Sequence, residues 1–109
     1  MPDATLTPDA VPGHFEGLSP DIVACVLLDS GGRFVAADGE HADAGEHLGE
    51  LGRRLLELAD TSQVEVSTGT GVVYALSQGE WTLVAVTGRF ALSSLVFFDM
   101  RQTLEELAA

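Results

Sequence analysis

QVEVSTGTGVVYALSQGEWTLVAV, residues 63–86, is the stretch that decides the fold, because it reads as three short strands joined by two glycine turns. Val64 and Val66 alternate with polar residues, which predicts a strand with one solvent-exposed face. The runs 72–76 and 81–86 are apolar at nearly every position, which predicts strands covered on both faces. Glycines in the two turns permit the positive φ angles that tight hairpins require. The stretch therefore predicts an antiparallel meander that starts at a sheet edge and moves inward.

A second hairpin is predicted before this meander. Residues 22–28 form another apolar run, the sequence DSGG at 29–32 is a turn signal, and residues 33–37 return as a second strand. Helical periodicity predicts one helix at about 44–60 and another that ends at about residue 107. The order of strand, strand, helix, three strands and helix indicates an α+β domain.

The middle helix has two apolar faces of different character. Its large apolar side chains recur at helical spacing and predict a core stripe of Ala44, Leu48, Leu51, Leu55, Leu58 and Ala59. An adjoining face carries Gly45, Gly49, Gly52 and Leu56. Each interior glycine costs a helix about 1 kcal/mol relative to alanine, so this face needs a compensating contact. Close approach of a second subunit and packing against the chain's own sheet would both provide one, and the sequence leaves both open.

Residues 1–21 are expected to form a flexible acidic arm, because they are rich in proline and glycine and show no helical or alternating period. Pro8, Pro12 and Pro20 argue against an ordinary helix before the first strand. We therefore expect the folded domain to span residues 22–109.

The last helix is expected to bury one face and to leave two large side chains uncovered. Its predicted core stripe consists of Leu92, Val96, Phe97, Met100, Leu104 and Leu107. Leu95 and Phe98 lie off this stripe, so a second neighbour is expected to cover them. They are candidate partner contacts, as are Arg53 and Arg54 on the middle helix.

The charge of the chain limits its partners. Among 109 residues there are 17 acidic side chains, five arginines and no lysine, which gives a formal net charge of −12. Such a charge disfavours nucleic acid and anionic lipid and favours a basic protein surface. No segment approaches the roughly 20 apolar residues of a membrane span, and the amino terminus has no signal sequence. A cytoplasmic protein without membrane insertion is expected.

Catalytic and cofactor-binding patterns are not recognisable. Cys25, the single cysteine, lies in an apolar run and is expected to be an inert core thiol. The acidic and histidine-bearing cluster at 38–50 matches no metal-binding spacing, and a solvated helix entrance explains it more simply. The glycines at 69–71 lack the lysine and hydroxyl residue of a phosphate-binding loop. We expect no enzymatic activity, no cofactor and no metal.

The element order and three phrases of the sequence resemble the roadblock family of dynein light chains and bacterial GTPase regulators. The phrases are VLLDSGGRFVAADG at 26–39, TGTGVVYALSQGEWTLVAVTG at 68–88 and SSLVFFDMRQTLEEL at 93–107. The resemblance implies a five-stranded antiparallel sheet in the order 2-1-5-4-3, with the middle helix on one face and the terminal helices on the other. Because of the prolines, the family's first helix is expected to be missing or irregular here.

The resemblance also implies a noncatalytic, dimeric module of a bacterial cell that binds a small Ras-like GTPase or a related signalling protein. Family members commonly dimerise through their third strands and middle helices. The residues expected at the dimer interface are Gly45, Gly49, Gly52, Leu56, Val64, Glu65, Val66 and Ser67. Two alternatives remain open. One is a small-molecule sensor domain of the PAS or GAF type, which would need a ligand cavity, and the other is a purely structural assembly protein.

Overall fold

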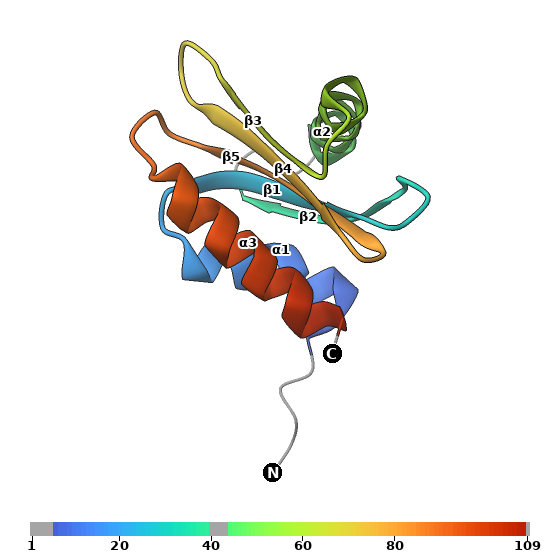
Figure 1. Ribbon diagram of the computed structural model, residues 1–109. Helices are drawn as coiled ribbons and strands as arrows, with labels where there is room; N and C mark the ends of the chain where they lie inside the picture. Colours follow the sequence, from blue (N-terminus) through green and yellow to red (C-terminus); the bar gives the residue numbers. More distant parts are fainter. Residues whose placement is uncertain (1–5, 40–43, 109) are drawn as a thin grey trace.

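In the computed structural model, a five-stranded antiparallel sheet is covered by helix α2 on one face and by helices α1 and α3 on the other (Figure 1). The structure describes residues 6–39 and 44–108. The strands run in the order β2-β1-β5-β4-β3, as the family resemblance implied. Their bounds are β1 Ile22–Leu28, β2 Phe34–Gly39, β3 Gln63–Ser67, β4 Val72–Gln78 and β5 Trp81–Thr87. The helices are the 3₁₀ turn η1 Pro8–Ala10, α1 Val11–Leu18, α2 Gly45–Ala59 and α3 Ser93–Ala108.

Strand β5 lies at the centre of the sheet, between β1 and β4, and pairs antiparallel with both. Leu83 and Ala85 point into the core beneath α1 and α3, whereas Val84 points into the core beneath α2. All three side chains are fully buried. The continuous apolar run of this strand is therefore explained by cover on both of its faces.

The larger core lies between the sheet and the pair of helices α1 and α3. Tyr74 of β4 packs edge to face against Phe97 of α3, with ring centroids 5.3 Å apart and an interplanar angle of 84°. The stripe predicted for the last helix is buried at Val96, Phe97, Met100 and Leu104. Leu92 is an exception, because it precedes α3 and is exposed.

The expected flexible arm is wrong for residues 8–18, and the family's first helix is present. Pro8 and Pro12 occupy the first turns of η1 and α1, where the missing proline amide would have no partner within the helix in any case. Val11 and Phe15, one turn apart on α1, are fully buried in the larger core. The folded domain therefore begins before residue 22. Residues 1–5 lie outside the described residues.

Helix α2 contacts the sheet mainly with the face that adjoins the predicted core stripe, and Leu48 and Leu55 of that stripe are only partly buried. Leu51 and Leu58 of the predicted core stripe are 45% and 84% exposed. The residues that are buried instead are Gly45, Gly49, Gly52 and Leu56, which we call the glycine face.

The glycine face lets α2 lie unusually close to its own sheet. A Cβ atom placed on Gly49 would lie 2.7 Å from Cδ2 of Leu28, and one placed on Gly52 would lie 2.4 Å from Cγ2 of Val84. Real Cβ atoms do not come so near to other heavy atoms. The close contact that offsets the helical cost of these glycines is therefore with the chain's own strands, which is one of the two alternatives that the sequence left open.

Candidate functional site

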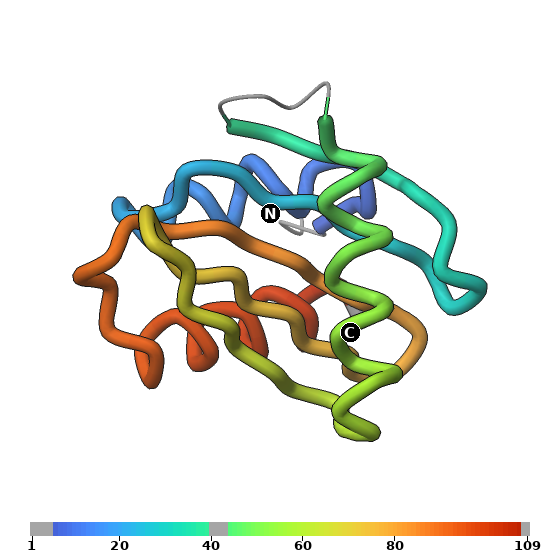
Figure 2. The backbone as a smooth tube through the Cα atoms, turned by 90° about the horizontal axis from the view of Figure 1, so that it is seen from above, coloured from blue at the N-terminus to red at the C-terminus, as the bar shows by residue number. Residues whose placement is uncertain are grey.

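Helix α2 leaves half of its face of the sheet uncovered. In Figure 2 it crosses the strands near the β1–β2 and β4–β5 turns, and no described helix lies over the half of that face nearer the β3–β4 turn. Val86 and Val64 belong to the α2 side of the sheet and are only partly buried. Val66, further along β3, is 37% exposed. An apolar strip of sheet is thus open to solvent beside α2.

The flank of α2 next to this strip is rich in leucine. We call Leu48, Leu51, Leu55 and Leu58 the leucine flank. Each of the first three comes one residue before a member of the glycine face, which places it to one side of the helix–sheet contact. Arg53 marks the other side, where it lies against Gly32 of the β1–β2 turn. The leucine flank therefore faces the uncovered half of the sheet, and the two surfaces form one apolar corner.

The two candidate arginines of α2 differ in their availability. Arg53 is held by two carboxylates, with Nη2 2.6 Å from Oε2 of Glu50 and Nη1 2.7 Å from Oε2 of Glu57. Its hydrogen bond to Glu50 holds the pKa of that carboxyl below its ordinary value. The side chain of Arg54 is 67% exposed, and its Nε lies 3.5 Å from Glu50. Of the two, Arg54 is the better placed to contact a partner.

Strand β3 is an edge strand, as the sequence predicted. Within the described residues it pairs only with β4. The side chains of Val64, Val66 and Ser67 remain partly or largely exposed. Glu65 is directed to the opposite face, where its Oε2 accepts a hydrogen bond of 2.7 Å from the hydroxyl of Ser93 at the start of α3. The backbone of β3 is thus paired with β4 along one edge, and its other edge has no strand partner among the described residues.

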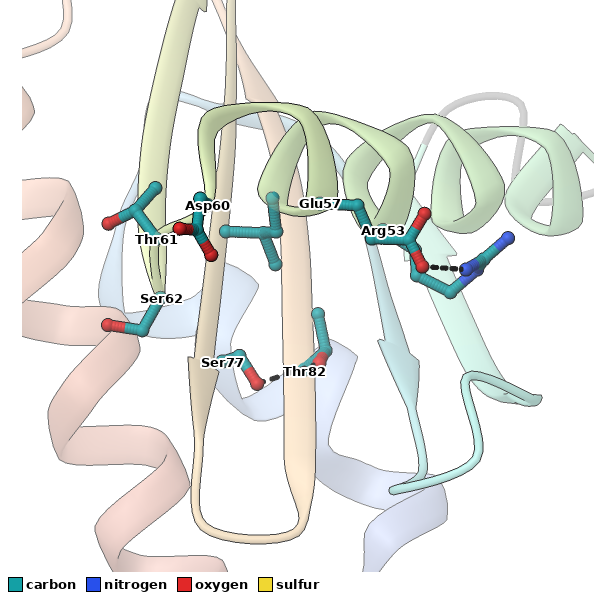
Figure 3. A pocket seen from close by; sticks show the side chains of 8 residues that line it. Arg53, Glu57, Asp60, Thr61, Ser62, Ser77 and Thr82 are labelled. Carbon is teal, nitrogen blue, oxygen red and sulfur yellow. Dashed lines mark hydrogen bonds and ion pairs between the residues drawn. The ribbon is translucent and has the colours of Figure 1, made fainter.

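A hollow of about 500 Å³ lies at the carboxyl end of α2 (Figure 3). All but one of the residues that line it are of polar type, the exception being Leu56, and Oγ1 of Thr82 donates a hydrogen bond of 3.2 Å to Oγ of Ser77 within it. Asp60, at its rim, ends the helix in the left-handed conformation with φ of 52°. The hollow is a surface depression whose rim residues are exposed, and it differs from the enclosed chamber that a PAS or GAF sensor domain would need.

The chemistry of Cys25 agrees with a core role. Its thiol is buried and donates a hydrogen bond of 3.2 Å to the carbonyl of Pro12. Burial, followed by the nearby carboxylates of Glu16 and Asp38, raises the pKa of the thiol to about 12. At neutral pH the group is a thiol, so it is a poor nucleophile and a poor metal ligand.

The described part of the chain contains neither a cluster of metal-ligating side chains nor a membrane-spanning helix. Within residues 6–39 and 44–108, no three histidine, cysteine, aspartate or glutamate side chains gather as metal ligands would. Residues 40–43 of the acidic cluster lie outside the described residues. No described helix is both long and apolar enough to cross a bilayer.

The sequence alone matches no family model and no curated protein, but the structure has clear neighbours. A Roadblock/LC7 domain from Streptomyces avermitilis superposes with a TM-score of 0.81 at 18% identity, covering 94% of this chain and 96% of that one. Myxococcus xanthus MglB gives 0.70 at 14% identity, with coverage of 96% and 94%. Acanthamoeba castellanii profilin IB gives 0.64 at 9% identity, with coverage of 94% and 98%. In strand order, helix placement and overall extent, the chain has the Roadblock/LC7 fold.

Proposed function

We propose that this chain is a noncatalytic regulatory scaffold that forms a homodimer and binds a small Ras-like GTPase or a related signalling protein in a bacterial cytoplasm. The observation that carries the proposal is the apolar corner formed by the leucine flank and the uncovered half of the sheet. Soluble monomers rarely expose contiguous apolar surface of this kind, and such surfaces mark sites of protein association. A second copy of the chain is the proposed occupant.

Two-fold pairing would use both parts of the corner. The open backbone of β3, at Val64, Glu65, Val66 and Ser67, can pair with β3 of a second copy and extend the sheet. The leucine flank of each α2 can then adjoin the half of the partner's sheet that the partner's own α2 leaves uncovered. In this arrangement the contact between the helices is made by the leucine flank, while the glycine face stays on its own sheet.

Burial of the leucine flank should contribute a large part of the free energy of dimerisation. Burying an exposed leucine contributes about 1.5–3 kcal/mol, and a two-fold interface counts each residue twice. Leu58, which is 84% exposed, could therefore contribute about 3–6 kcal/mol to the dimer by itself. Replacing it with glutamate should raise the dissociation constant at least about a hundredfold, since 1.4 kcal/mol corresponds to a factor of ten.

The regulatory role rests on charge and on the fold. A net charge of −12 favours a basic partner surface, and Arg54 is an exposed side chain of α2 that could discriminate between partners. The similarity to MglB and the family resemblance to GTPase regulators support a GTPase as that partner. Binding would favour one conformation of the GTPase over another, with no catalytic group contributed by this chain.

Light scattering over a concentration series tests the dimer. The wild-type chain should show twice the monomer mass, and the Leu58→Glu and Val66→Lys variants should be folded monomers. Leu95→Glu is the matched control, because it places the same charge on an exposed leucine of α3, and it should remain dimeric. A wild-type monomer at high concentration, or two interface variants that associate like wild type, would show that the corner is not the self-association surface.

Pull-down with purified GTPases of the same genome, each loaded with GDP or with a GTP analogue, tests regulation. A regulator should retain one GTPase in one nucleotide state more strongly than in the other. Binding that is equal in both states would favour the purely structural assembly protein instead.

A further inference from the structure

Helices α1 and α3 cover the other side of the sheet (Figure 1). A second apolar surface lies there, lined by residues from the end of α1 and the start of α3. It is a groove of about 300 Å³, lined mainly by apolar side chains. Phe90 and Leu95 in its wall are 89% and 57% exposed, and Leu18 and Leu92 are also exposed. Phe98, half-exposed, continues the apolar surface along α3. Four large apolar groups around one groove indicate a binding site for apolar side chains.

The groove is separate from the apolar corner that the dimer would use. The leucine flank lies on α2, which covers the opposite face of the sheet. A dimer formed through α2 and β3 would therefore leave the groove between α1 and α3 uncovered. An occupant of the groove must therefore be a molecule other than the dimer partner, or a second copy bound through a surface other than α2 and β3.

The polar part of the groove is acidic. Asp21 and Asp99 contribute to its lining, and no basic side chain is among the described residues that line it. Arg89, which adjoins the groove in sequence, has its guanidinium 5.4 Å from the ring centroid of Phe90. The aspartates are therefore available to pair with cations supplied by an incoming molecule.

A second copy of this chain fits the groove poorly. Two grooves brought together would place their aspartates near one another, and like charges oppose association. The chain also has no lysine and only five arginines. One of these, Arg53, is already held by two carboxylates on the opposite face. Charge complementarity thus favours a partner with a basic sequence over self-association through this surface.

We propose that the groove binds a short segment of another protein in which large apolar side chains stand next to lysine or arginine. The apolar anchors would lie among Leu18, Phe90 and Leu95, where burial gives most of the affinity. The basic side chains would pair with Asp21 and Asp99 at the rim, where charges govern the rate of association and the choice of partner. The proposal does not depend on the dimer or on a GTPase.

Selection from a displayed library of random twelve-residue peptides against the full chain tests the proposal. The selected peptides should share an apolar anchor beside a basic residue. A fluorescently labelled selected peptide is then titrated by anisotropy against wild type and variants. Leu95→Glu should weaken binding by about tenfold or more, because it puts a charge where the anchor is buried. Asp99→Asn, which preserves size, should weaken binding and reduce its dependence on salt.

Leu58→Glu is the matched control, since it makes the same substitution at an exposed leucine of α2 and should leave peptide affinity unchanged. Circular dichroism establishes that each variant is folded, and light scattering reports its mass, so loss of the dimer and loss of peptide binding are measured separately. The proposal is overturned if no peptide is enriched, if the enriched peptides lack basic residues, or if they bind Leu95→Glu and Asp99→Asn as tightly as wild type.

Discussion

Replacing Gly52 with alanine tests whether the glycine face sets the position of α2. The added Cβ would lie 2.4 Å from Cγ2 and 2.7 Å from Cγ1 of Val84, well inside the 3.4 Å at which ordinary contacts begin. Val84 is fully buried, and its branched side chain has few alternative rotamers. The strain must therefore be relieved by lifting α2 away from the sheet.

The magnitude follows from two opposing effects. Overpacking a core costs about 1–3 kcal/mol, and exchanging glycine for alanine within a helix returns about 1 kcal/mol. With two contacts this short, the cost should lie near the upper end of its range, so Gly52→Ala should lower the free energy of unfolding by about 1–2 kcal/mol. Gly17→Ala is the matched control, because a Cβ there would meet nothing within 4 Å. It should raise the free energy of unfolding by up to about 1 kcal/mol.

Urea unfolding followed by circular dichroism measures both variants at one protein concentration. The double variant Gly52→Ala with Val84→Ala removes the colliding methyl groups, so the two substitutions should be less damaging together than their sum by about 1–2 kcal/mol. A Gly52→Ala chain as stable as wild type, or a strictly additive double variant, would falsify the close contact. If Gly52→Ala left unfolding unchanged and only weakened the dimer, the glycine face would after all lie between subunits.

Further tests address the amino-terminal helix and the buried thiol. Phe15→Ala should cost about 3–5 kcal/mol in urea unfolding, because a fully buried ring is removed, whereas Leu18→Ala should cost little; equal effects would mean that α1 is not part of the core. The pKa of Cys25 is about 12 in the folded chain against 9.0 for a free thiol, so only the unfolded chain releases the proton in this range. Wild-type stability should therefore fall as the pH rises from 9 towards 12, by up to about 1.4 kcal/mol per unit, and parallel pH profiles of wild type and Cys25→Ala would refute this.

The sheet could be predicted from the sequence because its signals are local. Strand β1 was expected at 22–28 and is found at Ile22–Leu28, since an apolar run ends there at a strong turn sequence. The alternation around Val64 and Val66 correctly marked β3 as an edge. The strand order came from the family resemblance, and the apolar runs agreed with it.

The packing of α2 could not be predicted in the same way. Its extent was close to correct, but hydrophobic periodicity gives weight to Leu51 and Leu58 and none to a glycine. The face that contacts the sheet is chosen by the distance that Gly49 and Gly52 permit to strands elsewhere in the chain. That distance is a tertiary property. For this reason the periodicity pointed to the leucines, whereas the residues of α2 that are buried on the sheet are the glycine face.

The first helix could not be predicted from its prolines, because proline inside a helix breaks it. Pro8 and Pro12 are instead at starting positions, where proline is favoured. The spacing of Val11 and Phe15, four residues apart, was the signal that could have revealed the buried side of α1. The groove could be predicted only in part. Helical periodicity places Leu95 off the core stripe of α3, but its proximity to Leu18 depends on the docking of α1.

The alternation of β5 between the two cores also affects how the chain can fold during synthesis. Leu83 and Ala85 complete one core and Val84 completes the other, so both layers share this one strand. Because β5 spans Trp81–Thr87, the earlier helices α1 and α2 leave the ribosome before the central strand of their sheet does. A nascent chain that stops before residue 81 would expose the apolar sides of both helices at once, and it would be a natural substrate for chaperones.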